Sequence, residues 1–383
     1  MLRTYSVNLA GPGHVQRGVV CQDACCVETC ANVVIAAVAD GLGSEAHSEI
    51  GSRVAARAAV EACRERLAER GAELGAEAIV REAFAAAYRA VIEESAASGI
   101  PEDEMDCTLC LALFDGRRVA FGCAGDSGLI AALDDGRYEP LTSMQRDEEG
   151  RVFPLCFEDH WAFGAREGVA SILLATDGVL EGLIAPPALA RWTDNPVDTF
   201  VARGFLHPDL GEGDLAELQR DAEAFLQAVP VELVDDDKTV VVAFDDERPA
   251  GLMPEDYYAG PDWEAVAAKA SAVLYAPAAP QPAPAGEPAA VGPAAEPVEH
   301  RALHAKPRTE GRTVPASAVT PRPVRKPLVE AAESAGAALA SLGMGTLAVA
   351  TRAVGGGAAL AKATAEALTT KDVALPDQDA PKE

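Results

Sequence analysis

Residues 108–142 read TLCLALFDGRRVAFGCAGDSGLIAALDDGRYEPLT and contain four short, largely apolar runs. The pair Asp115-Gly116 separates the first two runs, and Asp135-Gly136 separates the last two. An Asp-Gly pair between strand-forming runs is typical of a tight hairpin turn. The stretch therefore predicts consecutive antiparallel strands, and it argues against a regular alternation of strand and helix.

Further strands and two long helices are expected around this stretch. NVVIAAVAD (32–40), ASILLATDG (170–178) and TVVVAF (239–244) are apolar runs that predict buried strands. Residues 48–70 and 77–97 are rich in Ala and carry Arg and Glu at helical spacing, which predicts helices. Strands in runs, with helices in separate blocks, indicate an α+β layered sandwich.

Composition divides the chain after residue 249. Residues 1–249 are expected to form the folded domain, and residues 250–328, rich in Pro and Ala, a linker with one short helix near its start. An Ala/Gly-rich helical segment is expected at 329–370, followed by a disordered tail at 371–383. Residues 334–351 are uncharged, but their small side chains favour a soluble or surface-docking helix over a membrane span.

The charge of the chain excludes some classes of partner. The 383 residues include 32 Lys and Arg against 60 Asp and Glu, a formal net charge of −28. Residues 250–383 hold 12 basic and 15 acidic residues, so residues 1–249 hold the remaining 20 and 45. Such an acidic domain lacks the basic face that nucleic-acid binding needs. The beginning MLRTYSVNLAGPGH has no apolar signal-peptide core, which favours a cytoplasmic location.

The cysteines raise the question of a disulfide framework or a zinc site. Nine Cys is an odd number, which argues against a disulfide framework. Four of them crowd together, but their spacing matches no common zinc pattern. Positions within an apolar strand are therefore the favoured interpretation. The four are Cys21, Cys25, Cys26 and Cys30.

Acidic residues recur where the predicted strands begin or end. Each one alone is an ordinary turn residue. If the loops converge, however, several carboxylates share a small volume and repel one another unless cations neutralise them. Hard divalent ions with oxygen ligands suit such a cluster, and two of them can activate a bridging water. The residues are Asp23, Asp40, Asp126, Asp177 with Glu181, and Asp235 to Asp237.

Residues 13–244 resemble the metal-dependent protein phosphatases of type 2C, in particular their compact bacterial branch. The resemblance rests on the order and separation of six pieces, each weak alone. It implies a four-layer sandwich of two antiparallel β-sheets flanked by helices. The pieces are GHVQRGVVCQDA (13–24), VADGLGS (38–44), DCTLCLALF (106–114), GCAGDS (122–127), LLATDGVLEG (173–182) and DDKTVVV (236–242).

This resemblance implies a binuclear manganese or magnesium centre with a third, weaker ion. Asp40 would bridge the two main ions, and Asp177 and Asp236 would complete their centre. Asp126 and Glu181 match the third site. The full set of implied metal-binding residues is Asp23, Asp40, the backbone carbonyl of Gly41, Asp126, Asp177, Glu181 and Asp236.

The reaction implied by the resemblance is hydrolysis of phosphoserine or phosphothreonine by a water that bridges the metals. Asp40, Asp177 and Asp236 would be the catalytic residues, and no covalent intermediate would form. The substrate would be a phosphoprotein made by a serine/threonine kinase. A small phosphoester as substrate, and a catalytically silent domain that binds a phosphorylated or kinase partner, are the alternatives.

Some positions depart from the pattern of the family. Gly18 stands where many members have an arginine that binds the substrate phosphate, so Arg17 or His14 would take that role. Leu42 stands where many members have a histidine that could donate a proton. The aspartates of the implied binuclear centre are all present, which favours an active enzyme.

Overall fold

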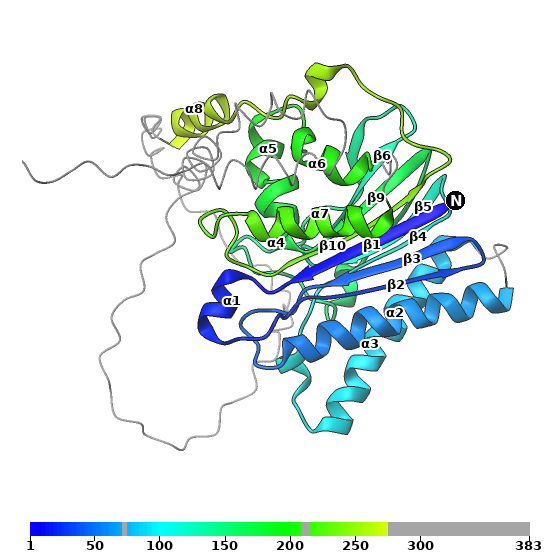
Figure 1. The fold of residues 1–383 in the computed structure, drawn as a ribbon. Helices are drawn as coiled ribbons and strands as arrows, with labels where there is room; N and C mark the ends of the chain where they lie inside the picture. The colour runs from blue at the N-terminus through cyan, green and yellow to red at the C-terminus, as the bar shows by residue number, and fades with distance from the viewer. Residues whose placement is uncertain (71–74, 209–213, 275–383) are drawn as a thin grey trace, which may run out of the picture.

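Two antiparallel β-sheets form the centre of the computed structural model, which describes residues 1–70, 75–208 and 214–274 (Figure 1). Every pair of neighbouring strands is antiparallel. Sheet 1 has the order β1 (Leu2–Leu9), β10 (Lys238–Asp245), β9 (Val169–Ala175), β6 (Gly128–Leu133), β7 (Tyr138–Pro140). Sheet 2 has the order β2 (Ala24–Cys30), β3 (Val33–Ala39), β4 (Leu109–Phe114), β5 (Arg118–Ala124), β8 (Ala162–Glu167).

Helices cover the outer face of each sheet. The antiparallel pair α2 (Ser48–Arg70) and α3 (Ala76–Ser98) packs on sheet 2, close to the predicted positions (Figure 1). Helices α6 (Thr199–Leu206) and α7 (Leu215–Ala228) pack on sheet 1. The expected α+β architecture, a four-layer sandwich of two antiparallel sheets flanked by helices, is confirmed.

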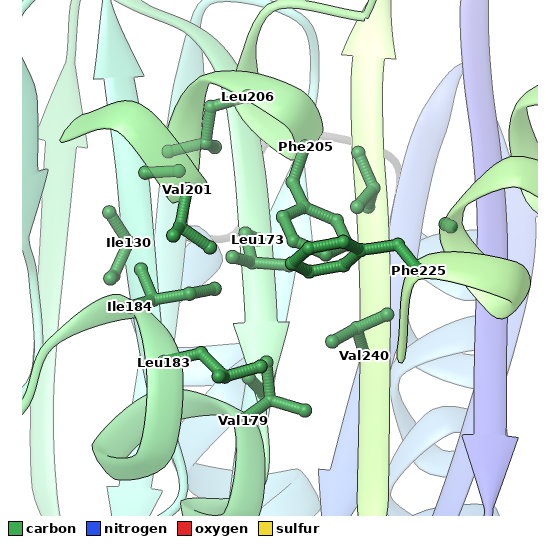
Figure 2. Close-up of a cluster of buried hydrophobic side chains, with 14 of the residues drawn as sticks. Ile130, Leu173, Val179, Leu183, Ile184, Val201, Phe205, Leu206, Phe225 and Val240 are labelled. Atoms are coloured by element: carbon green, nitrogen blue, oxygen red, sulfur yellow. The ribbon is translucent and has the colours of Figure 1, made fainter. Parts of the chain in front are cut away.

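Three apolar clusters hold the four layers together. The inner cluster joins the facing sides of the sheets, with Val38 of β3 and Leu174 of β9 among its fully buried members. A second cluster joins sheet 2 to α2 and α3. In the third, Phe205 and Phe225 meet edge to face at 5.9 Å over Leu173 of β9 (Figure 2). The cores are built largely from Ala, Val and Leu, consistent with a sequence in which only 5% of residues are aromatic.

The predicted hairpins are present, but the chain changes sheets between them. Asp115 accepts hydrogen bonds from the backbone N–H groups of Arg117 and Arg118, and Gly116 has φ 87° in the turn between β4 and β5. Asp135-Gly136 joins β6 to β7. Strands β5 and β6 lie in different sheets, so residues 125–127 cross from one sheet to the other.

The packed chain continues beyond residue 249, where the sequence analysis placed the start of the linker. The Tyr257 hydroxyl accepts a hydrogen bond from the backbone N–H of Tyr138 at 2.8 Å, and Tyr258 is 3% exposed. Helix α8 (Trp263–Leu274) follows, and Val266 on it is buried. Aromatic packing of the short segment around Tyr257 and Tyr258 thus attaches residues 250–274 to the helical layer over sheet 1.

The rest of the predicted linker, the Ala/Gly-rich helical segment and the tail lie outside the described residues. Within the described part, no helix is both long and apolar enough to cross a bilayer.

Candidate active site

The register of both sheets brings the predicted acidic positions to one end of the sandwich. In sheet 1, Ala175 at the end of β9 pairs with Val240 near the start of β10 and with Gly128 at the start of β6. In sheet 2, Ala39 at the end of β3 pairs with Ala24 at the start of β2. Residues just outside these strand ends therefore lie close together, which is the condition under which the acidic loops would form one cluster.

Asp40 follows β3 directly and is held by Thr108. The backbone N–H of Asp40 donates to the Thr108 hydroxyl at 2.9 Å, and the Thr108 N–H donates to the Asp40 carbonyl at 2.7 Å. The Thr108 hydroxyl also lies 2.7 Å from that of Ser127. Gly41 comes next, and a Cβ there would lie 2.7 Å from the Ser48 carbonyl oxygen, so only glycine fits. The backbone that presents the Asp40 carboxylate is therefore closely constrained.

Asp23 lies deeper, between the two sheets. Its carboxylate accepts a 2.7 Å hydrogen bond from the Thr176 hydroxyl, and the side chain of Thr176 in turn accepts from the Thr239 N–H. Asp23 is 7% exposed, and its burial raises its pKa to about 8. This side chain therefore supports the strand ends from beneath the acidic group.

Asp237 anchors the N-terminal loop, although only its neighbour Asp236 was singled out as a ligand. The buried carboxylate of Asp237 accepts from the N–H groups of Gly11 and Gln22, both at 2.6 Å. Its Oδ1 also lies 2.8 Å from Nδ1 of His14. Asp236 beside it points outward, with a side chain 54% exposed.

Three carboxylates come close enough together to share a metal ion. Asp40, Asp126 and Asp177 each offer an oxygen, and these oxygens lie within 4.8 Å of one another. Oδ1 of Asp126 is buried and has no hydrogen-bond partner among the described residues. Desolvation, followed by repulsion from nearby carboxylates, raises the pKa of Asp177 to about 7 and that of Asp40 well above its usual range. An oxygen-only donor set under such repulsion fits a hard divalent cation.

A second group lies beside the first and includes a nitrogen donor. His14, Asp236 and Asp237 have donor atoms within 4.8 Å of one another. His14 sits on α1 (Pro12–Arg17) and is only 6% exposed, with Nε2 3.9 Å from Asp236. Because Asp237 is already occupied by two backbone N–H groups, Asp236 is the member of this group best placed to take an ion.

These groups line an open cleft with a volume of about 490 Å³. The predicted phosphate-binding residues both border it: Arg17 is exposed on the last turn of α1, whereas His14 is buried against Asp237. Most of the other lining residues are acidic or polar. The cleft thus brings the basic side chain of Arg17 and a cluster of carboxylates into one lining.

Arg146 was missed by the sequence analysis. It comes from the segment between β7 and β8, and its Nη2 lies 2.5 Å from both Asp126 and Glu181. The residue stands outside the strand ends, in a stretch with no helical or strand periodicity, so no pattern in the sequence pointed to it. Glu181 lies in the π-helical turn η4 (Leu180–Ile184), which follows α4 (Asp177–Val179).

The sequence matches a family described as Protein phosphatase 2C over residues 10–212, more than half of the chain. The chain belongs to the protein phosphatase 2C family. The resemblance inferred from the six sequence pieces is thereby confirmed. Membership of this hydrolase family agrees with an acidic cleft suited to divalent cations.

Solved structures of bacterial proteins, two of them phosphatases, are similar to this chain at low sequence identity. A bacterial serine phosphatase is 13% identical with a TM-score of 0.44, covering 66% of this chain and 100% of its own. The serine/threonine phosphatase Stp1 from Staphylococcus aureus is 15% identical with a TM-score of 0.44, covering 64% and 96%. PppA from Pseudomonas aeruginosa is 19% identical with a TM-score of 0.42, covering 63% and 97%. Among curated proteins, none matches the sequence.

Proposed function

We propose that this member of the protein phosphatase 2C family is a Mn²⁺- or Mg²⁺-dependent phosphatase that hydrolyses phosphoserine and phosphothreonine in proteins. The proposal rests chiefly on the carboxylate oxygens of Asp40, Asp126 and Asp177, which meet at the base of an open cleft. Divalent ions bound there would supply an activated water and offset the charge of the phosphoryl group. We assign this activity to residues 1–249 together with residues 250–274, which pack against them.

The acidic residues of the site divide into those that would bind the ions and one that would support them. Asp40, Asp177 and Asp236 would hold the two ions, with the Gly41 carbonyl as a further ligand. Asp23 would support the centre from below through Thr176, to which it is hydrogen-bonded. Keeping these positions fixed before substrate arrives is what makes such electrostatic stabilisation effective.

Phosphate capture falls to Arg17 in this proposal. Arg17 is exposed and lines the cleft, so its guanidinium can meet a phosphate that approaches from solvent. An arginine is well suited to this task because its planar group can donate two parallel hydrogen bonds to a phosphate. His14 is instead tied to Asp237, so we assign it to positioning the N-terminal loop.

Asp177→Asn tests the assignment of the centre. The full-length chain is expected to hydrolyse an aryl phosphate with Mn²⁺ and not with EDTA. The variant should lower the Mn²⁺-dependent rate by about 100-fold or more, the scale of losing one preorganised electrostatic contact. Circular dichroism should show the fold unchanged.

The matched control is Glu167→Gln, which removes an 80% exposed carboxylate at the far end of β8. It should keep the wild-type rate. Wild-type activity in Asp177→Asn would refute the assignment. Metal binding without turnover in the wild type would instead favour the catalytically silent binding domain.

A further inference from the structure

Arg146 reaches into the acidic cluster and pairs with three of its carboxylates. Its Nη2 lies 2.5 Å from Oδ2 of Asp126, 2.5 Å from Oε1 of Glu181 and 3.6 Å from Oδ2 of Asp177. Its Nε donates a second hydrogen bond to Asp126 at 2.9 Å. Among the described residues, no other cation pairs with Asp126. One guanidinium thus lies between the two carboxylates that the family resemblance implies for a third, weaker metal ion.

The position of Arg146 is fixed by its neighbour Gln145. The Gln145 backbone N–H donates to the Gly125 carbonyl, and its side chain accepts from the Gly125 N–H, both at 3.0 Å. The Gln145 side chain also donates to the Cys123 carbonyl. Residue 146 itself bridges to Val152 across its own loop. These contacts attach the loop to the end of β5, so Arg146 projects from an anchored segment.

Asp126 uses its two oxygens differently. Oδ2 accepts both hydrogen bonds from Arg146, whereas Oδ1 is buried and has no hydrogen-bond partner among the described residues. Asp126 also belongs to the group of three carboxylates with Asp40 and Asp177. Arg146 therefore orients Asp126 so that one oxygen stays available to the main centre while the other is neutralised.

We propose that the guanidinium of Arg146 takes the place of a third metal ion at Asp126 and Glu181, so that this chain holds two ions. The inference rests on the proposed function, because it presupposes the binuclear centre. A metal ion that used the same two oxygens would need the space that Nη2 occupies, so arginine and ion exclude each other. The guanidinium is also attached to the chain, so it cannot dissociate into solvent as a bound metal ion can.

Counting the bound ions tests directly whether Arg146 takes the place of a third metal ion. Full-length, metal-free protein is equilibrated with Mn²⁺ at neutral pH, and bound manganese per chain is measured by mass spectrometry after removal of free ion. Two ions are expected for the wild type and three for Arg146→Ala, because the freed carboxylates need a cation. Adding Glu181→Gln to Arg146→Ala should return the number to two, because Glu181 belongs to neither group of the main centre.

Matched variants separate this effect from a general change in charge. Arg151→Ala removes a 76% exposed arginine of the same loop that pairs with Asp147 and Glu149, and it should leave two ions bound. Arg146→Lys keeps a positive charge beside Asp126, so this variant should also bind two manganese ions. Arg146→Gln serves as a second uncharged variant if Arg146→Ala does not fold.

The outcomes distinguish the inference from the function on which it rests. Three ions in the wild type would overturn the inference whatever the variants do. Two ions in a folded, uncharged Arg146 variant would overturn it as well. No bound manganese in the wild type would instead refute the binuclear centre itself.

Discussion

At the scale of single residues, the candidate site depends on buried acidic groups with specific partners. Asp237 is the clearest case, since both of its oxygens accept backbone N–H groups at 2.6 Å. These donors belong to Gly11 and Gln22, on either side of α1. The Asp237 carboxylate therefore joins the two ends of the N-terminal segment that contains His14 and Arg17.

Asp237→Asn should destabilise the fold although it hardly changes the shape of the side chain. Whichever way the amide is oriented, its NH₂ group faces a backbone N–H that now lacks an acceptor. The expected loss in the free energy of unfolding is about 1–3 kcal/mol, the range for one unsatisfied buried donor. Urea denaturation of the full-length protein measures it.

Asp235→Asn is the control for this prediction, because Asp235 is exposed two residues away. It should leave the unfolding midpoint within experimental error. Equal midpoints for Asp237→Asn and Asp235→Asn would show that the Asp237 hydrogen bonds do not stabilise the N-terminal loop.

The sequence predicted the strand-end acids but not their partners. Asp40 and Asp177 follow apolar runs, so the strand period alone places them at the edge of a sheet. Arg146 lies in a polar loop without periodicity, and its contacts depend on how the loop folds back onto β5. The distinct tasks of Asp236 and Asp237 depend on which side chain faces inward, which only the folded structure shows.

At the scale of elements, the residue that caps helix α6 makes the stability of the fold depend on pH. Asp198 precedes α6, is 1% exposed and accepts hydrogen bonds from the N–H groups of Phe200 and Val201. Burial raises its pKa from 3.8 to about 7. Because the folded chain holds this proton more tightly than the unfolded chain, ionisation of Asp198 costs stability as pH rises from about 4 to about 7.

Asp198→Asn should therefore stabilise the protein more at pH 8 than at pH 5. Asparagine caps a helix about as well as aspartate but does not ionise. The difference in melting temperature between variant and wild type should grow through this range and level off above pH 7. Asp214→Asn, at the exposed cap of α7, is the matched control and should show no such trend. A pH-independent difference for Asp198→Asn would contradict the linkage.

Hairpins and long helices were predictable because local signals define them. Asp-Gly turns and the helical spacing of residues 48–70 act over a few residues. The attachment of residues 250–274 was not predictable, since it depends on Tyr257 and Tyr258 meeting Tyr138 from a distant strand. Likewise, the crossing at residues 125–127 follows from the packing of the two sheets.

At the scale of the whole molecule, the fold concentrates negative charge at one end of the sandwich. The chain carries a formal charge of −28, and the raised pKa values of Asp23, Asp40 and Asp177 reflect burial first and repulsion from neighbouring carboxylates second. Arg146 offsets part of this charge from within the chain. Divalent cations would offset the rest, which couples the stability of this end to metal binding.

The central claim is tested most directly by phosphate release from a phosphothreonine peptide, measured while Mn²⁺ is titrated into metal-free, full-length wild type and Asp40→Asn. We expect no release before metal is added, a saturable rise in the wild type, and a rate near background in the variant at every Mn²⁺ concentration. Equal release with and without metal, or a wild-type response in folded Asp40→Asn, would contradict the account.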